Sequence, residues 1–217
     1  MPAARERIGL YRGDALVGLA VYSMPSQVKV LDHLPCPRAV SVELGRLVLL
    51  EDVPAHGESW FIARAHELMR ARGYEGVVSH ADPVERTDLA GERVKPGHVG
   101  LVYQATNAIY TGLATARTLR LMPDGRVFNN RTMSKIRARE RGWRYGVEQL
   151  VAAGAPGPTT GDLAAWLREV LPRVTRAVRH HGNHRYLMPV SATARRCLAG
   201  CSLPYPKAPA AARSEAA

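Results

Sequence analysis

The chain has 217 residues, 46% of them hydrophobic, so it is long enough and apolar enough to fold around its own core, and intrinsic disorder is not expected. No apolar run approaches the roughly 20 residues that a membrane span needs. The formal net charge of +11 favours a polyanionic partner such as nucleic acid. Three cysteines without disulfide spacing, and a polar N-terminus, predict a cytoplasmic protein.

The N-terminal segment is rich in strand patterns. Ile8–Tyr11 and Ala15–Tyr22 are β-favouring runs on either side of Arg12-Gly13-Asp14, which predicts a hairpin. Ala39–Leu50 begins as an alternating strand and ends in a continuous apolar run. Such a run is expected of a strand that is covered on both faces.

The next segment predicts a helix, a strand and a loop. Ser59 is the expected N-cap of a helix that ends near Arg72. The residues expected on its buried face are Phe61, Ala65 and Leu68, flanked by Ile62 and Met69. Tyr74–Ser79 is the next predicted strand, and the charged, aperiodic stretch Val84–Pro96 predicts a mobile surface loop.

A second helix is expected from His98 to Tyr110, with Gly112 as its end. Strands are predicted on both sides of the Pro123-Asp124-Gly125 turn. Helical composition dominates Thr132–Ala153, and Gly154–Pro158 is a predicted linker. The last elements are a helix from Thr160, with an apolar stripe of Leu163, Trp166, Leu167, Val170 and Leu171, a strand at Arg185–Val190, and a disordered tail after Pro206.

This order predicts an α/β fold: a mixed central sheet with flanking helices and a mainly helical insertion before the last strand. The expected organisation is a core at residues 1–131, a basic helical insertion at 132–182, a closing segment of the core at 183–204 and a tail at 205–217.

Two groups of polar residues are candidates for chemistry. Ser79, His80 and Asp82 follow one another at the end of a predicted strand, where ligands bind in open α/β sheets, although Asp82 can equally cap the loop. Tyr103, Asn107 and Tyr110 would share one face of the second helix. A tyrosine hydroxyl can donate a proton and an asparagine can hold an adenine edge, while packing of the tyrosines in the core is the alternative.

Basic residues gather in the C-terminal half, with aromatic residues and few acids among them. Phosphate-backbone contact is therefore favoured over a merely solvated surface. The residues predicted to bind double-stranded DNA are Lys135, Arg137, Arg139, Arg141, Arg144, Arg176 and Arg179. His180, His181 and His184 have helical spacing but no nearby cysteine or carboxylate, so a metal requirement stays unknown.

Four sequence blocks together resemble the Mom-like phage proteins of the GNAT acyltransferase superfamily: SVELGRLVLLEDVP, GESWFIARAHELMRARG, VVSHADP and GHVGLVYQATNAIYTG. The resemblance is close over about Val40–Thr115, and GWRY, NHRY and LPYPK extend it more loosely. It implies a GNAT sheet whose central strands part to admit the pantetheine arm of acetyl-CoA or a related CoA thioester. The usual GNAT pyrophosphate signature, Q/R-x-x-G-x-G/A, is missing before Ser59.

The resemblance also implies roles for individual residues. The donor would be bound by the backbone of Leu47, Val48 and Leu49 and by the amides of His56, Gly57, Glu58 and Ser59. Without the resemblance, the residue spacing of this loop indicates only an ordinary turn between a strand and a helix. Tyr103 would be a general acid near the sulfur. Asp82, with Ser79 and Asn107, would assist catalysis, and Glu43, Arg46, His80 and Tyr110 would bind the acceptor.

By this resemblance the chain adds a methylcarbamoyl-type group to N6 of adenine in phage DNA, in the host cytoplasm, and shields that DNA from restriction. Reaching the exocyclic amine would require flipping the base from the stack. The alternatives are a GNAT enzyme acting on another modified base, a protein or a small amine, and a non-catalytic DNA-binding protein. The oligomeric state is left open.

Overall fold

The computed structural model describes residues 3–159 and 161–207. It divides into two compact units. The sheet unit is formed by the chain up to Asp82, by His98–Ala114 and by the chain from Asn183 onward. The helical unit is formed by Pro83–Gly97 and Thr115–Gly182. In the described part of the chain, no helix is long and apolar enough to cross a membrane.

The sheet unit is built on a six-stranded mixed sheet with the order β1-β2-β3-β4-β10-β7. The strands are β1 (Ala4–Arg12), β2 (Ala15–Ser23), β3 (Ser41–Leu49), β4 (Gly76–Ala81), β10 (His184–Pro189) and β7 (Ile109–Leu113). β3 and β4 are parallel, and every other neighbouring pair is antiparallel. The predicted α/β class, the N-terminal hairpin and the last strand are confirmed.

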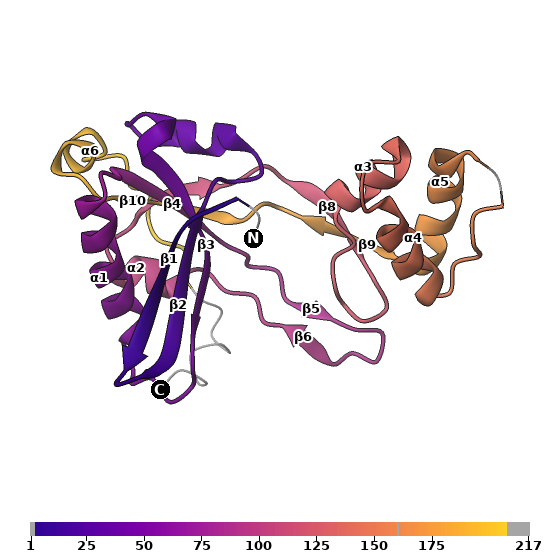
Figure 1. Cartoon of the computed structure of the whole chain (residues 1–217), viewed down its shortest axis with the longest axis horizontal. Helices are drawn as coiled ribbons and strands as arrows, with labels where there is room; N and C mark the ends of the chain where they lie inside the picture. The colour runs from indigo at the N-terminus through magenta and orange to yellow at the C-terminus, as the bar shows by residue number, and fades with distance from the viewer. Residues whose placement is uncertain (1–2, 160, 208–217) are drawn as a thin grey trace. The chain divides into compact units, whose positions relative to one another are not determined.

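Helices cover both faces of this sheet (Figure 1). α1 (Gly57–Ala71) and α2 (Leu101–Ala105) pack on one face, where Phe61, Ile62 and Tyr103 join strand residues in the main core. The 3-10 helix η1 (Val28–His33) packs on the other face through Leu31, which contacts Val78 and Leu187. A second 3-10 turn, η2 (Arg38–Val40), precedes β3, and α6 (Ala192–Cys197) follows β10.

The parallel ladder between β3 and β4 is unusually short. It joins Ser41–Glu43 to Gly76–Val78 and ends there. Beyond it, β3 remains paired with β2 and β4 with β10 as far as Leu49 and Ala81. The Ser79 hydroxyl donates to the Leu44 carbonyl oxygen at 3.0 Å, at the point where the ladder stops. The two central strands therefore separate toward their carboxyl ends.

Two details of this region differ from expectation. Val48 and Leu50 are half exposed, so the predicted coverage of the apolar run on both faces is wrong; this part of β3 lies beyond the ladder with β4. α1 begins at Gly57 rather than after Ser59, and its N-cap is His56 in a left-handed conformation. Leu68 is 47% exposed, because Ile62 and Met69 occupy the buried face.

The second helix is shorter than predicted. α2 ends at Ala105, Asn107 adopts φ 55°, and the following residues form β7. Tyr103, Asn107 and Tyr110 consequently do not share a helix face. Asparagine tolerates the left-handed conformation, and pairing of Ile109 and Tyr110 with β10 outweighs the helical pattern in the sequence.

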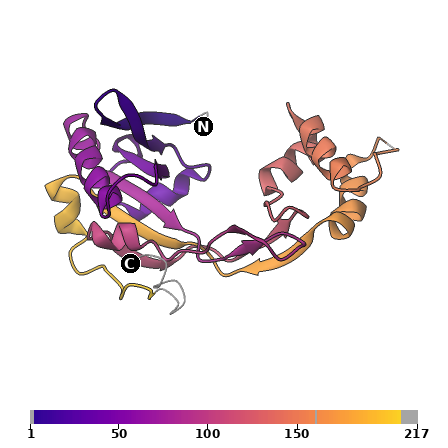
Figure 2. The same cartoon turned by 90° about the horizontal axis from the view of Figure 1, so that it is seen from below.

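The helical unit combines β ribbons with helices (Figure 2). Its strands are β5 (Arg86–Thr87), β6 (Arg93–Lys95), β8 (Arg117–Leu121) and β9 (Arg176–His180), and its helices are α3 (Asn130–Ala138), α4 (Trp143–Ala152) and α5 (Leu163–Val174). The loop predicted at Val84–Pro96 is thus a short β5–β6 ribbon. Across the predicted Pro123-Asp124-Gly125 turn, a bridge joins Leu121 to Val127, and the N–H groups of Met122 and Phe128 donate to the carbonyl oxygens of Arg126 and Arg120. The regular ladder of β8, however, is with the distant β9.

The predicted helical regions of this unit are confirmed. The apolar stripe of α5 is buried against Ile136 of α3 and Leu150 of α4. Asp162 caps α5 by accepting hydrogen bonds from the backbone N–H groups of Ala164 and Ala165. Thr160, the predicted start of this helix, and the predicted tail beyond Lys207 lie outside the described residues. The functional division into core and insertion stays a prediction.

Candidate active site

A carboxylate and an imidazole meet where the central strands separate. The Glu43 Oε1 atom lies 3.1 Å from His80 Nδ1. Their side chains are 22% and 15% exposed, so water still reaches the pair. Strand alternation places both on the face covered by η1. The pair can accept and hold a proton from a substrate group that enters this face.

A second polar group lies on the opposite face of the sheet, which α1 and α2 cover. The Ser79 hydroxyl is fully buried, and Tyr103 of α2 is 7% exposed. Burial raises the pKa of Tyr103, a hydrogen bond with Ser79 partly offsets the rise, and the nearby Glu43 carboxylate adds to it. Tyr103 therefore stays protonated near neutral pH, as a proton donor must.

Tyr22 is a neighbour of this group that the sequence did not single out. It lies on β2 opposite Leu44, its side chain is fully buried, and within the described residues its hydroxyl has no hydrogen-bond partner. Burial raises the pKa of Tyr22, and the neighbouring Tyr103 raises it further. Only its aromatic type at a strand position was visible in the sequence, and that pattern is equally typical of the core.

Tyr110, predicted to bind the acceptor, contacts a different set of residues. Its hydroxyl lies 2.8 Å from His184 Nδ1, and burial raises the pKa of Tyr110 and lowers that of His184. Arg185, the residue after His184 in β10, donates to the Thr111 hydroxyl at 2.8 Å, and one of its guanidinium nitrogens lies 2.9 Å from His33 Nε2. The NHRY block thus supplies polar side chains to the sheet unit, a role that its sequence did not reveal.

The first turn of α1 borders two hollows of the sheet unit. One, of about 530 Å³, is lined by His56, Ser59 and Asn107 together with further residues of α1. The other, of about 430 Å³, is lined by His56, Gly57 and Trp60 and by apolar residues of the β1–β2 hairpin. The predicted donor residues His56, Gly57 and Ser59 therefore line hollows beside the first turn of α1.

The fit of this region to a CoA-type donor rests on its backbone. The β3–β4 ladder ends before Leu47–Leu49, so a pantetheine arm could hydrogen-bond there as an added strand would. The first-turn N–H groups of α1 have no acceptor within the helix and favour an anion. The Glu58 carboxylate in that turn opposes this preference, so the geometry fits pantetheine better than pyrophosphate.

The remaining predicted residues are more dispersed. Asp82 directly follows β4, is half-buried, and accepts a hydrogen bond from the His98 N–H on its carbonyl oxygen. Arg46 is an exposed residue of β3 beyond the ladder with β4. Asn107 is exposed on the groove beside α1, so the structure places it with His56 rather than with Tyr110.

The predicted DNA-binding residues all belong to the helical unit. This unit holds 16 of the 30 lysines and arginines but only eight of the 19 acidic residues, and so carries +8 of the formal +11. Lys135, Arg137, Arg139, Arg141 and Arg144 lie on or between α3 and α4, and Arg176 and Arg179 lie on β9. All except the half-buried Lys135 are exposed. Across the described ranges, no group of three or more potential ligands could hold a metal ion.

The sequence matches the Mom protein family over residues 1–207. The chain belongs to this family. Membership supports a role in phage DNA modification. No curated protein matches the sequence.

Among solved structures, a tandem GNAT protein from the clavulanic acid biosynthesis pathway (without AcCoA) is similar to this chain. It has 12% sequence identity and a TM-score of 0.43, with 88% of this chain and 84% of that chain covered. The likeness is remote and carries no inference about this chain.

Proposed function

We propose that this Mom-family chain is a GNAT-type transferase that adds a methylcarbamoyl-type group to N6 of adenine in double-stranded phage DNA. The observation that carries the proposal is the separation of β3 and β4 in a chain of this family, with proton-handling side chains at the point of separation. Protection of phage DNA from host restriction is the function that such a modification would serve.

The donor is proposed to be acetyl-CoA or a related CoA thioester. Leu47, Val48 and Leu49 would bind its pantetheine arm, and the amides of His56–Ser59 would bind its phosphates. When bound, an acetyl thioester would supply an activated two-carbon unit, with the CoA thiolate as the leaving group. It contains no nitrogen, so the amide nitrogen of a methylcarbamoyl-type group would come from a separate amine donor.

The chain's own residues would manage the protons. Glu43 and His80, in contact with each other, would take a proton from the acceptor amine, and Asp82 at the end of β4 would orient that amine. Tyr103 would give a proton to the leaving group, with Ser79 holding its hydroxyl. Asn107 would assist from the groove beside α1.

The acceptor is proposed to be a duplex bound by the helical unit. The excess positive charge of this unit favours a polyanion. Its exposed arginines would bind the phosphates of the DNA backbone, which are present at every nucleotide whatever the sequence. Because N6 lies inside the base stack, the adenine would be flipped into the sheet unit for reaction.

Mass spectrometry of nucleosides from cells that express the chain tests this proposal. The expected result is an adduct on deoxyadenosine that falls by about 10²- to 10⁴-fold in Glu43→Gln or Tyr103→Phe. Asp14→Asn, on the exposed tip of the β1–β2 hairpin, is a control for the loss of a carboxylate and should leave the yield unchanged. An adduct on another base, or no adduct with the unaltered chain, contradicts the proposal.

A further inference from the structure

The junction between α3 and α4 is a tight, well-defined turn. α3 ends at Ala138 and α4 starts at Trp143, so four residues connect them. Two of the four, Arg139 and Gly142, adopt left-handed conformations with φ 50° and φ 85°. Two helices joined by three or four residues that include a glycine are typical of helix-turn-helix units.

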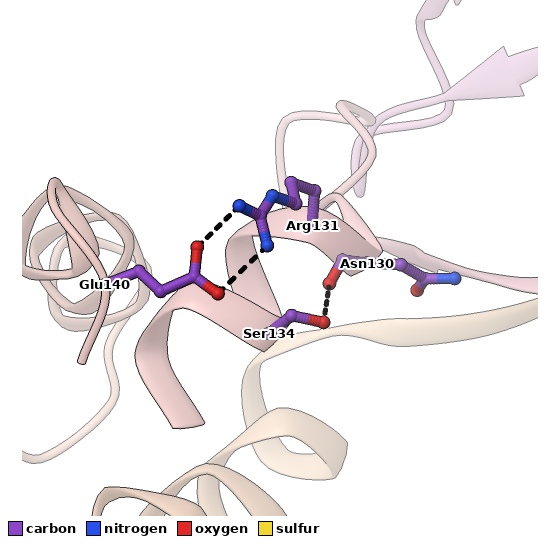
Figure 3. Close-up of polar contacts among 4 residues, drawn as sticks. All are labelled: Asn130, Arg131, Ser134 and Glu140. Atoms are coloured by element: carbon purple, nitrogen blue, oxygen red, sulfur yellow. Dashed lines mark hydrogen bonds and ion pairs between the residues drawn. The ribbon is translucent and has the colours of Figure 1, made fainter. Parts of the chain in front are cut away.

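Side-chain contacts hold this turn in place (Figure 3). The Arg131 guanidinium donates two hydrogen bonds to the Glu140 carboxylate, one of them at 3.1 Å, linking the first turn of α3 to the connection. The Ser134 hydroxyl donates to the Asn130 carbonyl oxygen at 3.1 Å within α3. The Asn129 side chain caps α3 by accepting from the Arg131 N–H at 2.7 Å. Glu140 is thereby neutralised, so its charge does not repel an anion at the turn.

Packing fixes which face of α4 points outward. A Cβ atom on Gly146 would lie 2.5 Å from Thr132 Cγ2, so the two helices approach each other at this glycine. Val147 and Leu150 are buried in the three-helix core with Ile136 of α3. The inner face of α4 is therefore committed to the fold, and its outer face is available to a partner.

The outer face of α4 carries Arg144, Tyr145 and Glu148, all exposed, and Tyr145 is 64% exposed. Arg137 and Arg141 lie close by in the chain, at the end of α3 and in the turn. Within the described part of the chain, Arg137, Arg141 and Arg144 have no carboxylate partner. Arg144 stacks over the Trp143 ring, 5.3 Å from its centroid, which restricts the directions that its guanidinium can take.

We propose that α3, the turn and α4 form a sequence-reading helix-turn-helix unit, with α4 in the DNA major groove. This inference rests on the proposed DNA substrate. Arg144 would bind guanine O6 and N7, Glu148 would accept a hydrogen bond from a cytosine amine, and Arg137 and Arg141 would contact flanking phosphates.

Glu148 distinguishes base reading from simple attraction to the backbone. A carboxylate one turn beyond Arg144 weakens any contact with phosphates, and a helix that served only as a basic surface would gain nothing from it. A base edge, in contrast, offers donors as well as acceptors. B-form DNA is the expected partner because the major groove of A-form RNA is too deep and narrow for a helix.

Selection from a randomised duplex pool with the full-length chain, followed by sequencing, tests the inference. The unaltered chain should enrich a short motif that contains guanine. Arg144→Ala should reduce the preference for that guanine by roughly 5- to 150-fold, as expected for the loss of one bidentate contact. Glu148→Gln should relax the preference at a neighbouring position and strengthen binding to unselected duplex.

Control variants separate base reading from charge. Arg137→Ala and Arg141→Ala should weaken binding to all duplexes alike and leave the motif unchanged. Arg168→Ala removes an exposed arginine of α5 outside the proposed surface, so both the motif and the affinity should stay close to those of the unaltered chain. Circular dichroism of each variant checks that the helices remain folded.

The outcomes are separable from those of the proposed function. DNA that is modified within an unchanged sequence context in Arg144→Ala and Glu148→Gln overturns the reading unit while leaving the transferase proposal intact. Suppose that the unaltered chain enriches a motif, that both variants lose it, and that the unaltered chain modifies no DNA. This result supports the reading unit and refutes the transferase proposal. No sequence preference in the unaltered chain, or tighter binding to double-stranded RNA than to DNA, overturns the reading unit.

Discussion

Tyr22 and Tyr186 form a matched pair for testing the polar interior of the sheet unit. Both side chains are fully buried, yet their hydroxyls differ. Tyr186 donates to the Val99 carbonyl oxygen and accepts from Gln104 Nε2 at 3.1 Å, whereas the Tyr22 hydroxyl has no partner among the described residues. Replacing each with phenylalanine removes one oxygen atom and keeps the ring.

The two substitutions should change the free energy of unfolding in opposite directions. A buried hydroxyl without a hydrogen-bond partner destabilises the fold by about 1–3 kcal/mol, and the van der Waals contacts of its oxygen offset only a few tenths of a kcal/mol. Tyr22→Phe should therefore stabilise the chain by about 1 kcal/mol. Tyr186→Phe leaves Val99 and Gln104 without that hydroxyl and should destabilise the chain by about 1–2 kcal/mol.

Urea unfolding followed by far-UV circular dichroism measures both changes as shifts of the midpoint at constant slope. If Tyr22→Phe destabilises the chain as much as Tyr186→Phe does, the hydroxyl of Tyr22 is satisfied and the reasoning is wrong. If it stabilises the chain but lowers DNA modification, the unpaired hydroxyl is retained for the site, as its position beside Tyr103 suggests.

Three further predictions concern pH, packing and salt. Burial lowers the pKa of His66 to about 4, so between pH 6.5 and 4 the unfolded chain binds a proton that the folded chain does not. The free energy of unfolding should therefore fall by about 2 kcal/mol from pH 6.5 to 4.5. Urea titrations at each pH should show that His66→Asn loses most of this dependence. Gly146→Val should destabilise the helical unit by about 1–3 kcal/mol because its Cβ meets Thr132, and an unchanged thermal midpoint would refute the close helix approach. Removing Arg137 and Arg141 together should lower the slope of log K against log salt by about two units in fluorescence anisotropy, and an unchanged slope would show that neither contacts phosphate.

The sequence by itself determined the features that depend on local pattern. The N-terminal hairpin, β3 and β4, α1 and the helices of the basic region were predicted because their periodicity and turn residues act within a few positions of one another. The parallel pairing of β3 with β4 agrees with the single helix that connects them. Family resemblance predicted site roles for Glu43, His80, Ser79 and Tyr103, and the structure brings Glu43 together with His80 and Ser79 together with Tyr103.

Only the tertiary structure decided the features that depend on distant partners. Ile109–Leu113 is a strand because β10, some 75 residues later, pairs with it, and the regular ladder of β8 is with the distant β9. The neighbourhood of Tyr22 and Tyr103 likewise joins β2 to α2 across the core. Such contacts depend on which surfaces become buried together. The residue pattern of one segment does not specify which distant segment will pack against it.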